Sequence, residues 1–330
     1  MLKPNQWQTR IVPGIAPNGE AIFSVLAKAT FSIRPDRVAQ IKDNGIPFCE
    51  KEEWVGGTDP LKFPPRCEPD LVPYKLRTDM LIHGRAFAPE GRRARFFDLT
   101  LAINDIHYQI RVVGKRYVEP SLTSITFSEP ELFDEMPLHY GLAYGGCDQI
   151  TDPDMPLSYP RNPVGKGFVI NPETKDLVGL ELPNLENAAQ LLTPASLRIG
   201  RYDKWTAAPE PRALGLAPKH SAPRNNAQNS SLHIWNAAPP RLCLPSLWGD
   251  ESITMTYMDR AHPKFTFELP GIVPTAFLNF GKGSQRKYMV LQTVEIFKEM
   301  NLMTQVWRAA FPVTNHSNSL SPDQFEFGVQ

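Results

Sequence analysis

Proline is the residue that most constrains how this chain can fold. The sequence has 33 prolines in 330 residues, about twice the usual share of ~5%. An interior proline costs an α-helix roughly 3 kcal/mol. Residues 1–150 contain 14 of them, residues 151–270 contain 16, and residues 271–330 only 3. The count excludes an all-helical enzyme and predicts that the middle of the chain is mostly loop.

A strict alternation of apolar and mostly polar residues marks the clearest strand. From Ala21 to Ile33 every odd position is apolar, and the even positions include Ser24, Lys28 and Thr30. Successive side chains of a strand point to opposite faces of the sheet. This segment is therefore predicted to be a long strand with one buried face.

A tight hairpin is predicted further along the chain. Alternating runs cover residues 97–103 and 106–112, and only Asn104 and Asp105 separate them. Both turn residues tolerate positive φ, as a two-residue hairpin requires.

The other periodic segments complete a mainly β prediction. Further strands are expected at residues 80–88, 122–127, 252–257, 264–269, 287–297 and 301–307, the last two joined by a turn at 298–300. Residues 185–192 read as a short helix capped by Asn184, and residues 129–136 as one further helical turn. We expect antiparallel, sandwich-like sheets with a proline-rich, loop-rich covering layer and one or two short helices.

A single domain over residues 1–330 is the expected organisation. It has a possible subdivision into a β-sheet part at 1–127, a loop-rich part at 128–270 and a C-terminal hairpin at 271–330. The loop-rich part contains Tyr159, Phe168, Trp205, Trp235 and Trp248. Aromatic residues at such a density usually pack loops onto a sheet, so these loops are expected to be ordered.

The net charge and the cysteines indicate which partners the protein can bind and in which cellular compartment it is located. The 35 basic and 35 acidic residues cancel, which removes the attraction that nucleic acid or an anionic membrane exploits. The first ten residues lack an apolar signal, and no run reaches the ~20 apolar residues of a membrane span. The four cysteines have no C-x-x-C pair, so we expect four reduced thiols in a cytoplasmic protein.

No arrangement of catalytic or metal-binding residues stands out. The seven histidines form no metal-binding motif, and Asp148, Asp152 and Asp154 lack the spacing of a calcium loop. Ser284 and Lys287 match S-x-x-K but precede a strand rather than open a helix. The glycines at 145–146 and 165–167 do not have the spacing of a phosphate loop. The sequence predicts no metal, no cofactor and no enzyme activity.

Several short strings in a fixed order resemble one bacterial family. They are Glu68–Ala88 (EPDLVPYKLRTDMLIHGRAFA), Pro137–Gly146 (PLHYGLAYGG), Tyr159–Phe168 (YPRNPVGKGF), Leu182–Glu186 (LPNLE), Asn236–Pro240 (NAAPP), Gly249–Ser252 (GDES), Phe267–Gly271 (FELPG), Leu291–Val294 (LQTV) and Trp307–Arg308. Together they resemble the family called domain of unknown function 2169, from near the N-terminus to about residue 312. The chain departs from it at residues 200–203 and 225–229, where relatives often have Gly-Thr-Tyr-Asp and an acidic Asp-Phe-Asp string.

The resemblance implies a non-enzymatic adaptor or chaperone of bacterial type VI secretion. Such a protein binds a toxic effector in the cytoplasm and helps to load it on the spike, made of a PAAR-repeat protein and VgrG. The family transfers no catalytic residue. The departures from its pattern affect the partner's identity more than the fold.

A partner-binding surface is expected in the loops that carry the resemblance. Large, rigid side chains are enriched at interfaces, which points to Tyr140, Tyr144, Tyr159, Arg161, Asn162 and Trp205. The alternative is that these residues hold the loops to the sheet.

Two other functions stay open at this stage. One is a hydrolase or carbohydrate-active enzyme with Asp148, Asp152, Asp154 or His139 beside a cleft. The other is a structural component of the spike or baseplate.

Overall fold

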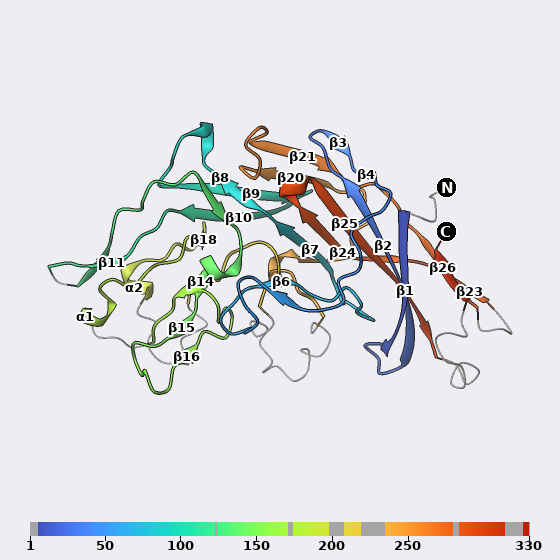
Figure 1. Ribbon diagram of the computed structural model, residues 1–330, viewed down its shortest axis with the longest axis horizontal. Helices are drawn as coiled ribbons and strands as arrows, with labels where there is room; N and C mark the ends of the chain where they lie inside the picture. The colour runs from blue at the N-terminus through green and yellow to red at the C-terminus, as the bar shows by residue number, and fades with distance from the viewer. Residues whose placement is uncertain are drawn as a thin grey trace.

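The computed structural model describes residues 6–122, 124–170, 174–197, 208–218, 235–279, 284–313 and 326–329. The fold is mainly β, as predicted, and two large sheets dominate it (Figure 1). Most strand pairs are antiparallel. The parallel pairs are β24 with β7, β21 with β3 and β14 with β17.

The first large sheet has a long antiparallel centre. Its strands, in spatial order, are β1 (Trp7–Ile15), β2 (Ala21–Ser32), β25 (Leu302–Pro312), β24 (Val290–Phe297), β7 (Thr78–His83) and β19 (Cys243–Leu244), with β4 (Gln40–Ile41) also on β2. The 3-10 turn η7 (Lys298–Met300) joins β24 to β25, at the turn that the sequence predicts.

Strand β2 forms where the alternation predicts it, but both of its faces are buried. Val25 on one face and Leu26 on the other are fully buried, and Lys28 is 2% exposed. A segment before β7 covers the second face: Phe48 and Leu71 pack on Leu26. Lys28 is tolerated there because its Nζ lies 2.5 Å from Asp70 Oδ2 and donates to Pro47 O. The prediction of one buried face was wrong.

The second large sheet contains the predicted hairpin. Its order is β18 (Leu185–Asn187), β10 (Ile106–Val113), β9 (Phe96–Ile103), β20 (Ser252–Thr256), β21 (Lys264–Glu268) and β3 (Arg37–Val38). Asn104, in the hairpin turn, has φ 47°, as this kind of turn requires.

The helix predicted at residues 185–192 was wrong. Residues 185–187 are β18, which pairs with β10, and a turn follows in which Ala189 N donates to the Asn187 side chain. Leu185 enters the core of the large sheets, whereas Leu192 enters a second core. Strand pairing and burial in two directions override the local helix preference.

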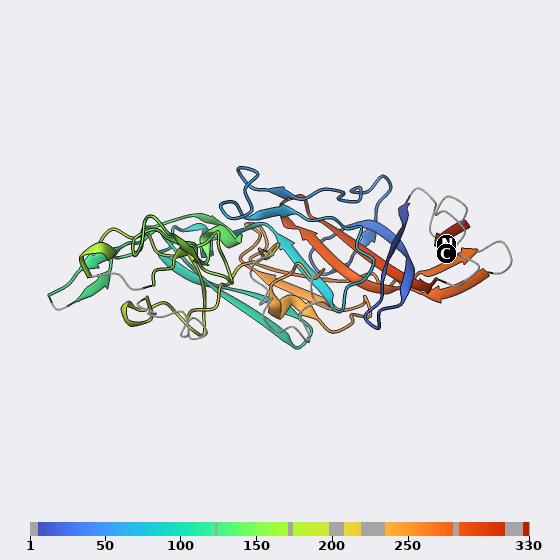
Figure 2. The same cartoon turned by 90° about the horizontal axis from the view of Figure 1, so that it is seen from below.

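One continuous core lies against both large sheets. It includes Val25 and Phe31 from the first sheet and Leu101 and Phe267 from the second. Figure 2 shows the long strands of the first large sheet toward one end of an elongated molecule, the β9–β10 hairpin near the middle, and the loop-rich segments in the other half.

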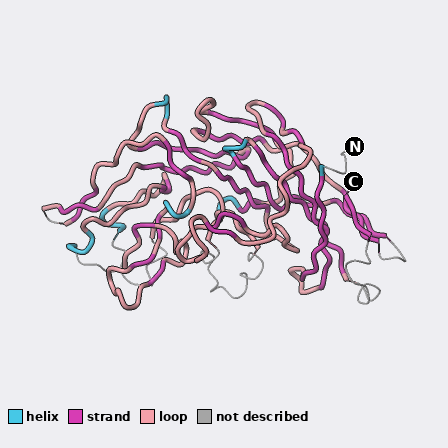
Figure 3. Tube along the Cα trace, in the orientation of Figure 1, coloured by secondary structure: helices cyan, strands magenta, loops and turns pink. Residues whose placement is uncertain are grey.

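The loop-rich half has its own smaller core and short elements. The second core combines Val118 and Ile125 with residues up to Ala208, so it draws on both sides of residue 127. Figure 3 shows that loops dominate this half. The paired strands are β8 (Arg85–Phe87) with β13 (Glu135–Pro137), β11 (Val118–Pro120) with β12 (Ile125–Phe127), β14 (Tyr144–Gly145) with β17 (Lys166–Gly167), and β15 (Cys147–Asp148) with β16 (Leu157–Ser158).

Helices among the described residues are few and short. They are α1 (Thr174–Leu177) and α2 (Pro194–Leu197), with 3-10 turns η2 (Pro89–Gly91), η3 (Tyr140–Leu142) and η6 (Pro240–Leu242). The helical turn predicted at residues 129–136 was wrong, because residues 135–137 pair as β13 with β8. None of the described helices has the length and apolar character to cross a bilayer.

The strand predicted at residues 287–297 divides at Met289. Residues up to 288 belong to β23 (Ser284–Tyr288), which pairs with β22 (Thr275–Asn279) in a small sheet completed by β26 (Glu326–Val329). Residues from 290 onward form β24 in the first large sheet.

The expectation of four reduced thiols was wrong. Cys49 and Cys67 form a disulfide that closes a loop containing β5 (Glu53–Trp54) and β6 (Pro65–Cys67). Cys147 and Cys243 are free. Because 18 positions separate the bonded cysteines, no short motif reveals the pair. The disulfide removes the thiol-based reason for expecting a cytoplasmic location.

Candidate functional site

The two loops in which the sequence places the partner-binding residues meet at one junction, which we call the loop junction (residues 138–148 and 159–168). Strand β14 of the first loop pairs in parallel with β17 of the second. Gly146 N donates to Asn162 O, and Tyr159 N donates to Gly146 O, each over 2.8 Å. The PLHYGLAYGG and YPRNPVGKGF strings are therefore the two halves of one structure.

Asn162 is the centre of the loop junction. Its side chain is fully buried and donates to Tyr140 O at 2.9 Å and to Tyr144 O at 3.0 Å. Gly145 has φ 147°, and a Cβ added there would lie 2.2 Å from Asn162 O. The glycines of these strings therefore allow two backbones to approach each other closely; they do not cradle a phosphate.

The tyrosines of the loop junction point inward. Tyr144, Tyr159 and Phe168 pack ring against ring, with centroids 5.4 Å and 5.0 Å apart. Tyr140, Tyr144 and Tyr159 are at most 2% exposed. Burial raises the pKa of all three hydroxyls, so they stay neutral.

The structure therefore corrects the expected surface. The side chains of Tyr140, Tyr144, Tyr159 and Asn162 hold loops together and do not form an exposed patch. Arg161 is half-buried. Trp205 lies outside the described residues.

A second buried polar centre joins three of the family strings. Asp79 in β7 is fully buried. Its carboxylate accepts from Lys75 Nζ at 2.7 Å, Asn236 Nδ2 at 2.7 Å and Ala237 N at 2.9 Å. Lys75 also donates to Thr293 Oγ1 at 3.0 Å. The sequence analysis did not predict this centre. The one local indication was a lysine and an aspartate four positions apart, Lys75 and Asp79, inside the Glu68–Ala88 string.

The groups of the Asp79 centre are suited to holding segments together rather than to catalysis. Burial lowers the pKa of Lys75, but the charge and hydrogen bond of Asp79, together with the charges of Glu68 and Asp70, raise it above its usual value, so the amine stays charged. Cys243 Sγ lies 3.5 Å from Asp79 Oδ1. Burial and the Asp79 charge raise the pKa of this thiol far above its usual range. Without a thiolate, Cys243 is a poor nucleophile.

Two further family strings also act as internal ties. In LPNLE, Glu186 pairs with Arg116 and accepts from Leu192 N at 3.0 Å. In GDES, Glu251 accepts from Trp248 N at 2.6 Å and from Gly249 N at 2.9 Å. The polar residues of these strings fix the scaffold.

Large apolar side chains are exposed beside the GDES turn. Gly271 N donates to Gly249 O, and Met289 N donates to Pro274 O, which brings three segments together. These segments carry the exposed side chains of Trp248, Val273, Tyr288 and Val290, a set that we call the exposed apolar strip. Trp248 is 80% exposed and Tyr288 79%, unusually high values for large aromatic residues.

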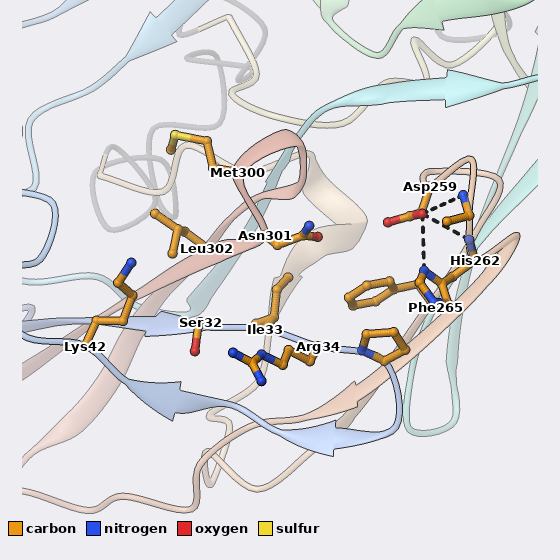
Figure 4. A pocket seen from close by; sticks show the side chains of 12 residues that line it. Ser32, Ile33, Arg34, Lys42, Asp259, His262, Phe265, Met300, Asn301 and Leu302 are labelled. Atoms are coloured by element: carbon orange, nitrogen blue, oxygen red, sulfur yellow. Dashed lines mark hydrogen bonds and ion pairs between the residues drawn. The ribbon is translucent and has the colours of Figure 1, made fainter.

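An open hollow of about 460 Å³ lies at another end of the first sheet. Four segments form it: the end of β2 with Arg34, Lys42 just after β4, the loop after β20 with Asp259 and His262, and the turn Met300–Leu302. Figure 4 draws Arg34 and Lys42 on the β2 side, away from Asp259 and His262. We call this feature the cationic hollow.

The residues considered for enzyme chemistry do not converge. Asp148 is buried and accepts from Ile150 N, Thr151 N and Ile170 N, all within 3.0 Å, so it is a turn-forming carboxylate. Asp152 caps its own exposed turn. His139 Nδ1 accepts from Gly141 N at the start of η3. Within the described ranges, no three His, Cys, Asp or Glu side chains are grouped to hold a metal ion.

Comparison with known proteins gives one match. The model of a bacterial family described as "Uncharacterized protein conserved in bacteria (DUF2169)" matches residues 18–308, which is most of the chain. No curated protein and no solved structure matches.

Proposed function

We propose a function for this chain as a member of the uncharacterised bacterial family DUF2169, to which it belongs. The protein is a non-enzymatic adaptor that binds a type VI secretion effector and helps to load it on the PAAR/VgrG spike. It acts as a scaffold that holds another polypeptide.

The exposed apolar strip is the observation that supports this proposal. Trp248 and Tyr288 present large aromatic surfaces to solvent, and residues of these types supply much of the energy of protein interfaces. Their segments are fixed by backbone hydrogen bonds and by Glu251. A surface held in place before binding loses less entropy when it binds.

The buried polar side chains that link separate segments are consistent with the same role. Asn162, Asp79 and Glu186 each join segments that are distant in sequence, Glu186 through its ion pair with Arg116. These ties make a rigid body from a loop-rich chain, as an adaptor needs in order to present a partner in a fixed orientation.

Purification of the tagged chain from its own bacterium tests the proposal. We expect mass spectrometry to identify a PAAR-repeat protein, VgrG or a type VI effector in the eluate. Trp248→Ser and Tyr288→Ser each remove an aromatic anchor worth about 2 kcal/mol or more. Each should lower recovery of that partner about thirtyfold.

Leu122→Ser is the matched control. Leu122 is fully exposed and lies beside β11, at the opposite end of the molecule from β23 (Figure 1). This variant should recover the partner as the wild type does. If the wild type recovers none of the three protein classes, the adaptor proposal is wrong; if all variants recover them equally, the apolar strip is not the contact surface.

The adaptor acts in the cytoplasm, where effectors are loaded. We expect the chain to fractionate with cytoplasmic enzymes after osmotic shock. Release with the periplasmic fraction would contradict this location and would agree with the Cys49–Cys67 disulfide.

A further inference from the structure

The side chains of two cations in the cationic hollow have no ion-pair or hydrogen-bond partner in the part of the chain that the structure describes. These cations are Arg34 and Lys42, and both residues are exposed. Long cationic side chains beside a hollow offer charge-assisted hydrogen bonds to an incoming anion.

The acid in the lining does not neutralise these cations. Asp259 Oδ2 lies 2.5 Å from Lys298 Nζ, and Asp259 Oδ1 accepts from Ala261 N and His262 N within 3.0 Å. Although burial opposes it, the Lys298 hydrogen bond holds the pKa of Asp259 below its usual value. Asp259 is therefore ionised and already paired, which leaves the positive charge of Arg34 and Lys42 uncompensated.

A buried lysine fixes the walls of the hollow. Lys298 is 3% exposed. It donates to Asn301 Oδ1 at 2.7 Å and lies over the Phe265 ring, 4.1 Å from its centroid. Ile33 N donates to Asn301 O at 3.0 Å. These contacts connect three of the four segments, and Lys42 N donates to Thr30 O in β2, so the hollow is present before a ligand arrives.

The rest of the lining is apolar. Ile33 and Phe265 are buried, and Leu302 is half-buried beside them. Met300 is 55% exposed at the tip of the turn. Its unbranched thioether adapts to ligand side chains of different shapes.

We propose that the cationic hollow binds an acidic peptide segment of the protein that this adaptor holds. Arg34 and Lys42, which Figure 4 draws at separate places in the lining, each receive a carboxylate of the segment, and Met300 and Leu302 receive an apolar side chain of the same segment. This inference rests on the proposed function and specifies the chemistry of the partner. A peptide fits better than a small inorganic anion, because the small anion would leave the apolar side of the hollow unused.

Two peptide pools test the chemistry without an identified partner. One pool contains octapeptides built only from Asp, Glu, Leu, Val and Phe; in the matched pool, Asn and Gln replace the acids. Each pool is passed over the immobilised full-length chain, and retained peptides are quantified by mass spectrometry. We expect retention of acidic peptides about tenfold above the amide pool, a difference of about 1.4 kcal/mol.

Reversing the charges of Arg34 and Lys42 tests whether the acidic peptides bind at the cationic hollow. The double variant Arg34→Glu, Lys42→Glu should lose the excess retention of acidic peptides. Because both side chains are exposed, its melting temperature should match the wild type. The control variant Arg37→Glu, Lys51→Glu changes two exposed cations outside the hollow and should keep the excess.

Three outcomes would overturn the inference. They are equal retention of the two pools, unchanged retention by the Arg34/Lys42 double variant, and displacement of the peptides by equimolar inorganic phosphate, which would indicate a small-anion site. Partner recovery from the bacterium tests the adaptor role separately. Recovery of an effector together with failure of the peptide test would reject only this assignment of the hollow.

Discussion

Asn162 and the two carbonyl groups that it binds show how single buried side chains hold this loop-rich chain together. The amide satisfies Tyr140 O and Tyr144 O where no solvent reaches. Loops usually satisfy their backbone groups with water. Here the side chain replaces that water, which allows the loops to pack like a core.

Asn162→Ala should therefore destabilise the protein strongly. The substitution removes two buried hydrogen bonds and leaves a cavity, so we expect the free energy of unfolding to fall by about 2–3 kcal/mol. Guanidinium titration measures the change. The control Asn18→Ala removes an exposed amide that donates to Glu20 and should change stability by no more than about 0.5 kcal/mol. Equal effects of the two variants would contradict the role given to Asn162.

His139 makes stability depend on pH in a defined window. Burial, assisted by the charges of Lys166 and Arg85, lowers the pKa of His139 in the folded protein. As the pH falls below about 6.5, the unfolded chain takes up a proton that the folded chain excludes. Stability should therefore decrease on acidification, by at most about 1.4 kcal/mol per pH unit for this one proton.

The variant His139→Gln tests whether His139 causes this pH dependence of stability. Glutamine keeps an acceptor for Gly141 N but does not titrate. The stability difference between pH 8 and pH 5.5 should shrink in the variant, and any constant loss of packing will already appear at pH 8. An unchanged difference would show that another group causes the pH dependence.

At the scale of elements, the Cys49–Cys67 disulfide constrains the loop that contains β5 and β6. Cross-linking residues 18 positions apart stabilises a fold by about 3 kcal/mol through the unfolded chain. Cys67→Ser should lose about that amount in guanidinium titration, and dithiothreitol should reduce wild-type stability but not that of the variant. Cys147→Ser, which removes an exposed free thiol, should behave as the wild type. Equal responses of the wild type and Cys67→Ser to dithiothreitol would show that no such bond forms.

Strands were predictable where alternation extends over many residues. Strand β2, the β9–β10 hairpin and the β24–β25 turn lie where the sequence predicts them. The failures come from contacts between distant segments. Residues 46–72 bury the second face of β2, and β10 converts residues 185–187 from a local helix signal into a strand.

The functional surfaces were less predictable than the strands. An aromatic residue in a loop has the same local sequence signal whether it points inward or outward, so Tyr144 and Tyr159 were expected at a surface that they do not form. The Asp79 centre joins residues up to 218 positions apart, and no periodicity reveals such contacts. The cationic hollow likewise combines four separate segments of the chain.

At the scale of the whole molecule, two large cores and a smaller buried cluster on the second face of β2 support one elongated scaffold. The end of the molecule that contains the first large sheet carries the exposed apolar strip and the cationic hollow. Buried polar contacts order both parts: Asp79 in the first large sheet, and Asn162 and Glu186 in the loop-rich half. The proposed adaptor thus combines rigidity with two open surfaces of different chemistry: an aromatic strip for anchoring and a cationic hollow for an acidic segment.

Quantifying effector on the secreted spike tests this account most directly. The gene is deleted in its own bacterium, and the sheared spike fraction is analysed for VgrG and for the effector. The account predicts that VgrG remains while the effector is lost, and that the wild-type gene restores it but Trp248→Ser does not. Unchanged effector on the spike of the deletion strain would contradict the adaptor role.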